Sequence, residues 1–214
     1  MLSKSWLYNY NMLSKVPFNL FIPMSSANKI DANKIEYSSK RHYNQTYRTI
    51  NDDDTDVNKV KTEFRAYGNG SVNFKTDRNI GIITLNHAER KNAISGKMMA
   101  EFHDIMTSMK TRKDIKGLIL TGHGDFFCAG GDLQTITVHL NKPQKGWDMT
   151  CLMHETLKLF HELPLLSVAL VNGRALGGGA ELTLSTDLRA FSENTAKINF
   201  VQARMGLIPG WGGE

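Results

Sequence analysis

Long apolar runs and paired cysteines are both missing from this sequence. No uninterrupted apolar stretch approaches the roughly 20 residues that a membrane-spanning helix needs, so we expect no membrane association. The only two cysteines, Cys128 and Cys151, match no metal-binding or redox spacing, so we expect reduced thiols in an intracellular protein. The histidines from His87 onward form no metal-ligand motif, so we expect no metal site.

The sequence after residue 50 also has no excess of positive or negative charge. The formal net charge of the chain is +5. Residues 1–50 carry seven Lys or Arg and two acidic residues, whereas residues 51–214 carry nineteen of each sign. Because a neutral domain has no electrostatic footprint for a polyanion, we do not expect nucleic acid as a partner.

The N-terminal residues lack acidic side chains as well, since none precedes Asp31. Their mixture of Ser, Asn, Tyr and basic residues resembles a mitochondrial transit peptide, and an unstructured leader or a wrongly assigned start explains it equally well. Residues 51–56 are acidic and polar, which predicts a solvated linker. We therefore predict a disordered leader and linker over residues 1–65 and one folded domain over residues 66–214.

The central motif of this domain is an apolar run followed by a glycine turn. Residues 165–171 are apolar and predict a buried strand, and three consecutive glycines, residues 177–179, follow it. Residues 180–184 then predict a helix. Without side chains, the backbone N–H groups of the turn are able to face a ligand, and a helix start favours negative charge. A tight, closely packed turn explains the glycines equally well.

The remaining pattern alternates strands with helices and predicts an α/β fold. A hairpin is expected over residues 71–85, a helix from the cap Ser95 to about Lys110, and a buried strand over residues 117–122. A second glycine turn over residues 124–133 leads into another helix, with Asp132 as its expected cap. Further elements are expected over residues 147–163, 188–192 and 196–200. Two strand–glycine–helix turns are able to aim backbone donors at one point.

Five segments in this order resemble the enoyl-CoA hydratase/isomerase (crotonase) superfamily. They are GIITLN at 81–86, ERKNA at 89–93, FCAGGDL at 127–133, NGRALGGGAE at 172–181 and GLIPGWGG at 206–213. The resemblance implies a spiral of repeated strand–strand–helix units that assembles as trimers or paired trimers. Related chains continue for about another third of a chain, so we expect the spiral to be incomplete at its C-terminal end.

The resemblance also implies an acyl-CoA thioester as ligand, with the site residues following from the motifs. The thioester oxygen is expected between the backbone N–H groups of Gly131 and Gly178, with Gly177 beside them. The segments Lys91 to Ala93 and Ala129 to Leu133 match those that hold the pantetheine and adenine; the positions of interest are Lys91, Ala93, Ala129, Asp132 and Leu133.

Hydratases of this family use two glutamates, which lie around the water and the α and β carbons of the substrate. Glu181 matches the first, as a site residue or as a cap of its helix. Counting back from Gly206, the second position is Gln202, whose amide is no general base. Hydration of an enoyl thioester is therefore not the favoured prediction.

Residues 167–181 and 191–209 are most similar to family members that decarboxylate ethylmalonyl-CoA. The resemblance implies loss of CO2 from ethylmalonyl-CoA, and from methylmalonyl-CoA, through an enolate, with no cofactor because the thioester carbonyl is the electron sink. The alternatives are another acyl-CoA hydratase or isomerase, or an inactive fragment of the decarboxylase. The resemblance implies a cytosolic location, whereas the N-terminal composition favours the mitochondrion.

Overall fold

The computed structural model describes residues 55–212; of the leader and linker predicted over residues 1–65, residues 1–54 lie outside this range. The helices of the described part are α3 (Val57–Phe64), α4 (Gly96–Met109), α5 (Leu133–His139), α6 (Pro143–Glu162) and α7 (Gly178–Leu184), with the 3-10 turns η2 (Ala88–Arg90) and η3 (Gln202–Met205). The strands are β1 (Ser71–Asp77), β2 (Ile80–Asn86), β3 (Gly117–Gly122), β4 (Phe126–Cys128), β5 (Leu166–Val171), β6 (Arg174–Leu176), β7 (Leu188–Phe191) and β8 (Lys197–Asn199).

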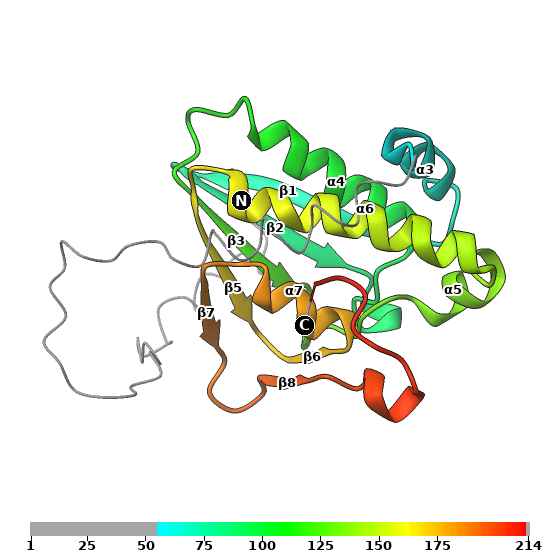
Figure 1. Cartoon of the computed structure of the whole chain (residues 1–214). Helices are drawn as coiled ribbons and strands as arrows, with labels where there is room; N and C mark the ends of the chain where they lie inside the picture. Colours follow the sequence, from blue (N-terminus) through cyan, green and yellow to red (C-terminus); the bar gives the residue numbers. More distant parts are fainter. Residues whose placement is uncertain (1–54, 213–214) are drawn as a thin grey trace, which may run out of the picture.

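Five strands form the main sheet in the order β1-β2-β3-β5-β7. The hairpin of β1 and β2 is antiparallel, as its sequence predicts, and the other neighbouring strands are parallel. Helices α4 and α6 lie side by side across one face of this sheet (Figure 1). Parallel strands need such crossover connections, and the layers bury one hydrophobic core between helices and sheet.

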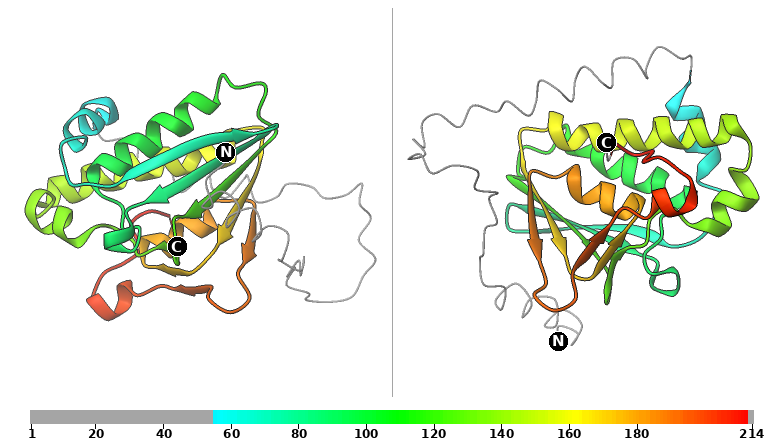
Figure 2. Two further views of the ribbon diagram at one scale, coloured as in Figure 1. Left: turned by 180° about the vertical axis from the view of Figure 1, so that it is seen from behind. Right: turned by 60° about the horizontal axis from the view of Figure 1, so that its bottom comes forward.

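Three short strands form a second, parallel sheet in the order β4-β6-β8. Each follows a strand of the main sheet along the chain: β4 follows β3, β6 follows β5, and β8 follows β7. Helix α7 packs against β4 and β6 of this sheet and against β5 of the main sheet (Figure 2). The predicted α/β fold of repeated strand–strand–helix units is confirmed. The strands β4 and β6 were not predicted, because three residues are too few to show a period.

One asparagine fixes the break between the two sheets. Asn172 lies directly after β5, is buried, and donates through its side-chain amide to the carbonyls of Gly122 at 3.0 Å and Gly124 at 2.7 Å. Its side-chain oxygen accepts from the backbone N–H of Gly122 at 3.2 Å. These bonds tie the end of β5 to the end of β3, so the two strands leave the main sheet at one place.

Helix α4 begins and is buried as its sequence predicts. The hydroxyl of Ser95 accepts from the backbone N–H of Met98 at 3.2 Å and so caps the helix. Residues at helical spacing, among them Met99, Phe102 and Met106, are fully buried. Helix α6 begins earlier than residue 147, because Pro143 supplies a favourable first helical position.

The folded domain starts before the predicted boundary at Ala66. Residues 57–64 form α3, whose Val60 and Phe64 are buried against the rest of the core. Asp56, interpreted as part of a solvated linker, caps this helix by accepting from two backbone N–H groups at 3.0 and 3.3 Å. The prediction of disorder is wrong for this segment, because an acidic residue at a helix start stabilises the helix.

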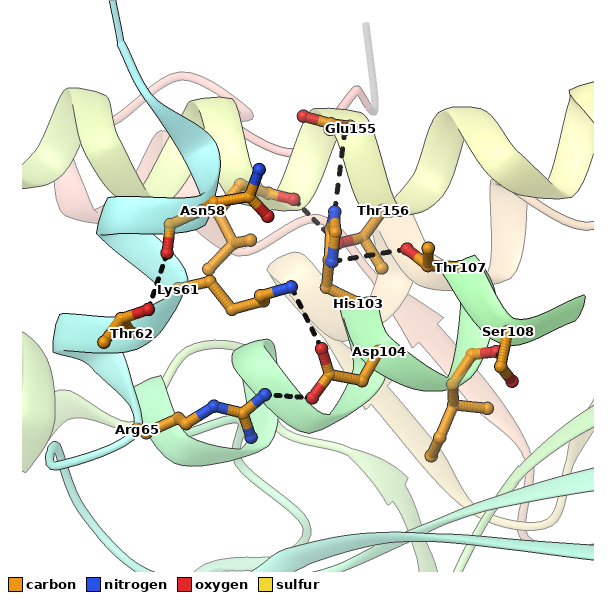
Figure 3. A network of polar contacts seen from close by, with 12 residues as sticks. Asn58, Lys61, Thr62, Arg65, His103, Asp104, Thr107, Ser108, Glu155 and Thr156 are labelled. Carbon is orange, nitrogen blue, oxygen red and sulfur yellow. Dashed lines mark hydrogen bonds and ion pairs between the residues drawn. The ribbon is translucent and has the colours of Figure 1, made fainter. Parts of the chain in front are cut away.

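Charged residues fasten the outer side of α3 to α4. Figure 3 shows Lys61 of α3 and Arg65, the residue that caps the end of α3, converging on Asp104 of α4, with the lysine ammonium 3.1 Å from the carboxylate. The same view shows His103 of α4 facing Glu155 of α6, with the imidazole Nε2 3.6 Å from the carboxylate. The three helices are thereby linked by polar contacts above the apolar core.

Candidate active site

The first glycine turn is held by a short parallel pairing. The N–H of Ile94 donates to the carbonyl of Gly130 at 2.8 Å, and the N–H of Asp132 donates to the carbonyl of Ile94 at 2.9 Å. Because successive amides of an extended chain point to opposite sides, the N–H of Gly131 points away from Ile94. Within residues 55–212 no hydrogen bond uses this N–H group.

The second glycine turn begins at Gly177, whose positive φ of 54° suits a residue without a Cβ. Its N–H donates to the carbonyl of Asn199 on β8 at 2.9 Å, and its own carbonyl accepts from Ala180 and Glu181. The first amide of the following helix, that of Gly178, has no carbonyl one turn earlier to bind. It too is not used by any hydrogen bond in the described part of the chain.

The two turns touch each other. A Cβ on Gly130 would lie 2.9 Å from the carbonyl oxygen of Leu176 and 3.2 Å from the amide nitrogen of Gly178. Both Gly131 and Gly178 are only half-buried, although most residues around them are fully buried. The structure therefore brings together the two glycines that were predicted to face one ligand, with both amides uncommitted.

Glu181 lies in the first turn of α7 and is 3% exposed. Its Oε1 accepts from the side-chain amide of Gln202 at 2.7 Å, and its Oε2 accepts from the backbone N–H of Trp211 at 2.6 Å. Gln202, which matches the position of the second glutamate, therefore contacts Glu181 directly, although the two residues are 21 positions apart in the sequence. Two residues that follow α7 in the sequence, Gln202 and Trp211, thus hold the carboxylate of Glu181.

Gln202 has one polar atom left over. Its side-chain amide nitrogen is used by Glu181, whereas its buried Oε1 has no hydrogen-bond partner among the described residues. A buried acceptor without a partner is costly, so this oxygen is suited to accept from a ligand or an ordered water.

Trp211 is a site residue that the sequence did not single out. Its ring lies against both glycine turns: a Cβ on Gly178 would be 2.5 Å from ring carbons Cε3 and Cζ3, and a Cβ on Gly131 would be 3.6 Å from Cζ2. The side chain is 4% exposed. The signal that could have identified it is a single large aromatic residue between glycines in the motif at residues 206–213.

Asp132 caps α5, which is the structural alternative that the sequence left open. Its carboxylate accepts from the backbone N–H of Thr135 at 3.1 Å and from the hydroxyl of Thr135 at 2.6 Å. Burial raises the pKa of Asp132, but hydrogen bonds from Thr135 and Gln134 outweigh it and hold the pKa below its usual value. The next side chain, Leu133, is 64% exposed and contributes a free apolar surface at the helix start.

The two predicted coenzyme A segments lie next to each other. The carbonyl of Lys91 accepts from the N–H of Ala129 at 3.1 Å. The ammonium of Lys91 lies 5.4 Å from the centre of the Phe126 ring, in a cation–π arrangement. Ala93 is buried, whereas Lys91 is exposed. These residues form one edge that continues from Asp132 and Gly131.

A cavity of about 590 Å³ opens beside this edge. Residues 86–90 line it together with Asp132, the cap of α5, and residues of α5 such as His139. Gly131, Gly178 and Glu181 are not among the residues that line it. The cavity adjoins the predicted coenzyme A segments and is separate from the place where the two amides meet.

Within residues 55–212 no three His, Cys, Asp or Glu side chains are arranged to hold a metal ion. No helix there is long and apolar enough to cross a membrane.

Comparison with known proteins identifies relatives of both sequence and fold. The sequence profile of the enoyl-CoA hydratase/isomerase family matches residues 75–214. Ethylmalonyl-CoA decarboxylase of Gallus gallus is 42% identical over 161 residues, which are 75% of this chain and 53% of that protein. The Homo sapiens enzyme of the same name is 42% identical over 155 residues, which are 72% of this chain and 50% of that protein. The chain thus spans about half the length of the curated relatives it matches.

Solved structures agree on the fold. An enoyl-CoA hydratase from Bacillus anthracis superposes with a TM-score of 0.63 at 29% identity, covering 66% of this chain and 55% of that one. An enoyl-CoA hydratase from Polaromonas superposes with a TM-score of 0.63 at 26% identity, covering 67% of this chain and 56% of that one.

Proposed function

Because the chain belongs to the enoyl-CoA hydratase/isomerase family, we propose that it acts on acyl-CoA thioesters and removes CO2 from ethylmalonyl-CoA. Methylmalonyl-CoA, which differs by one methylene, is proposed as a second substrate. The observation that carries the proposal is the meeting of two uncommitted backbone amides, those of Gly131 and Gly178, beside a buried carboxylate. The names and 42% identity of the relatives support the choice of substrate.

The first step breaks the bond between the α carbon and the carboxylate carbon. Its electron pair moves to the thioester carbonyl, CO2 leaves, and an enolate remains. The N–H groups of Gly131 and Gly178 would donate to the enolate oxygen as its negative charge develops. Loss of one donor of this kind costs about 3–4 kcal/mol of transition-state stabilisation in comparable sites.

The second step delivers a proton to the α carbon and yields the acyl-CoA. Glu181 or a water molecule would supply this proton. The free Oε1 of Gln202 supports the water route, because it is a buried acceptor directly beside Glu181. No cofactor is required, since the thioester carbonyl takes up the electron pair.

Hydration or isomerisation of an enoyl-CoA is the second candidate, favoured by the names of the superposed structures. These reactions would have to proceed with Glu181 as the single carboxylate, because its partner Gln202 carries an amide, which cannot act as a general base. Trimeric assembly and a cytosolic location stay predictions of the family resemblance.

The proposal is tested by measuring CO2 release from ethylmalonyl-CoA and hydration of crotonyl-CoA with the same protein. Gln202→Glu is assayed beside Asn194→Asp, an exposed amide-to-carboxylate change outside the site. We expect CO2 release by the wild type, loss of it in Gln202→Glu, and no change in the control. Strong hydration by Gln202→Glu with decarboxylation intact would contradict the role given to Gln202.

A chimaera that continues this chain with the C-terminal region of the Gallus gallus relative is assayed in parallel. CO2 release by the chimaera alone would support the decarboxylase and show that the added region is needed. Hydration of crotonyl-CoA without CO2 release from either protein would favour the second candidate.

A further inference from the structure

One indole ring contacts both glycine turns of the site. It is close enough to Gly178 that a Cβ there would lie 2.5 Å from two ring carbons, and it reaches within 3.6 Å of the corresponding point on Gly131. The ring therefore lies next to the position that a side chain of either glycine would occupy. No other side chain of residues 55–212 is among the nearest neighbours of both glycines.

The ring lies on the side of each glycine where a side chain would project, not on the N–H side. The amides of Gly131 and Gly178 stay free of hydrogen bonds within the described residues, and both glycines remain half-buried. The Trp211 ring is thus a wall next to the amides and does not use their donors.

The position of the Trp211 ring is restrained by a hydrogen bond of its backbone and by burial of its side chain. The N–H of Trp211 donates to Oε2 of Glu181 at 2.6 Å, and the other carboxylate oxygen is held by Gln202. The side chain itself is 4% exposed and belongs to the hydrophobic core. A ring anchored in this way keeps its place relative to Glu181.

A thioester whose oxygen accepts from both amides keeps its α carbon two bonds from that oxygen, so its α substituent must pass the groups that flank the amides. Trp211 is the described side chain that neighbours both glycines. We propose that Trp211 is a specificity-determining residue whose ring limits the size of the substituent on the α carbon. The inference rests on the acyl-CoA site proposed above and adds the residue that selects among its substrates.

The test compares Trp211→Ala and Trp211→Phe with the wild type, using Trp147→Phe on α6 as an indole control outside the site. The first measurement is kcat/KM for CO2 release from ethylmalonyl-CoA and from butylmalonyl-CoA. One methylene in an apolar pocket is worth about 10- to 200-fold in specificity. We therefore expect Trp211→Ala to raise the preference for the butyl substrate at least 10-fold, with Trp211→Phe shifted in the same direction.

The second measurement is binding of butyryl-CoA and octanoyl-CoA, which have no carboxylate to lose, by titration calorimetry. It separates the two proposals: absence of CO2 release by both the wild type and the chimaera refutes the decarboxylase, while the affinity ratio still reports on Trp211. An affinity ratio in Trp211→Ala that equals the wild-type ratio, in a protein with an intact thermal unfolding transition, overturns the inference. If Trp211→Ala does not fold, an unchanged ratio in Trp211→Phe overturns it instead.

Discussion

Replacing Gly178 by alanine tests the packing of the site most directly. The new Cβ would lie 2.5 Å from Cε3 and Cζ3 of Trp211 and 2.9 Å from Cη2. Non-bonded carbon atoms prefer separations of about 3.5–4.0 Å, so the ring must move by about 1 Å. The ring has little room to move, because Trp211 is buried in the core and its backbone N–H is hydrogen-bonded to Glu181.

The expected magnitude follows from two opposing effects. Overpacking of a filled core typically costs about 1–3 kcal/mol, and the better helix propensity of alanine returns up to about 1 kcal/mol. We therefore expect Gly178→Ala to lower the free energy of unfolding by about 1–2 kcal/mol, measured by urea denaturation. Misplacement of reacting groups by about 1 Å lowers rates by about 10²-fold, so CO2 release should fall by a similar factor.

Two further variants isolate the clash. Gly146→Ala on α6 is the control, because nothing lies within 4 Å of its new Cβ, and it should stabilise the helix slightly. The double variant Gly178→Ala/Trp211→Ala removes the clashing ring, so its destabilisation should be smaller than the sum of the single changes. If the single effects instead add within about 0.5 kcal/mol, the contact between Gly178 and Trp211 is not what the structure indicates.

Three other expectations concern stability and reactivity. Asp132→Ala should cost about 1 kcal/mol at pH 7 through loss of the α5 cap. Because the folded-state pKa of Asp132 is held below its usual value, the stability difference between wild type and variant should be present above the unfolded-state pKa and disappear as the pH falls through the folded-state pKa. Urea denaturation at pH 7 and pH 3 measures this difference, and an unchanged value at pH 3 would argue against the cap. Asn172→Ala should lower the free energy of unfolding by about 1–3 kcal/mol, since it removes the side-chain donor to the carbonyls of buried Gly122 at the end of β3 and of Gly124 in the following turn. A change below about 0.5 kcal/mol in thermal unfolding would speak against that role. Burial raises the pKa of Cys128 to about 12, so iodoacetamide at pH 8 should label this thiol only after unfolding, and rapid labelling of the folded protein by mass spectrometry would contradict its burial.

Local signals in the sequence predicted much of this fold. The hairpin, the caps Ser95 and Asp132 and the glycine turn at residues 177–179 depend on neighbouring residues, which the sequence shows directly. The start of the domain was placed too late, because α3 is stabilised by burial of Phe64 against distant helices. Local composition does not report such contacts.

Long-range arrangement was predicted less completely. The family pattern placed Gln202 opposite Glu181, but it did not show that Trp211 supplies the second hydrogen bond or that its ring contacts Gly178. Those contacts depend on the path of residues 202–211 past α7, which no periodicity in the sequence encodes.

The origin of the partners of Glu181 has a consequence for how the protein matures during synthesis. The glycine turns are held by pairings among residues 91–199, whereas the carboxylate is fixed by Gln202 and Trp211, which are translated later. A nascent chain would therefore complete its two amide donors before its carboxylate is positioned. Glu181 would gain these two hydrogen bonds only when the segment from Gln202 to Trp211 docks.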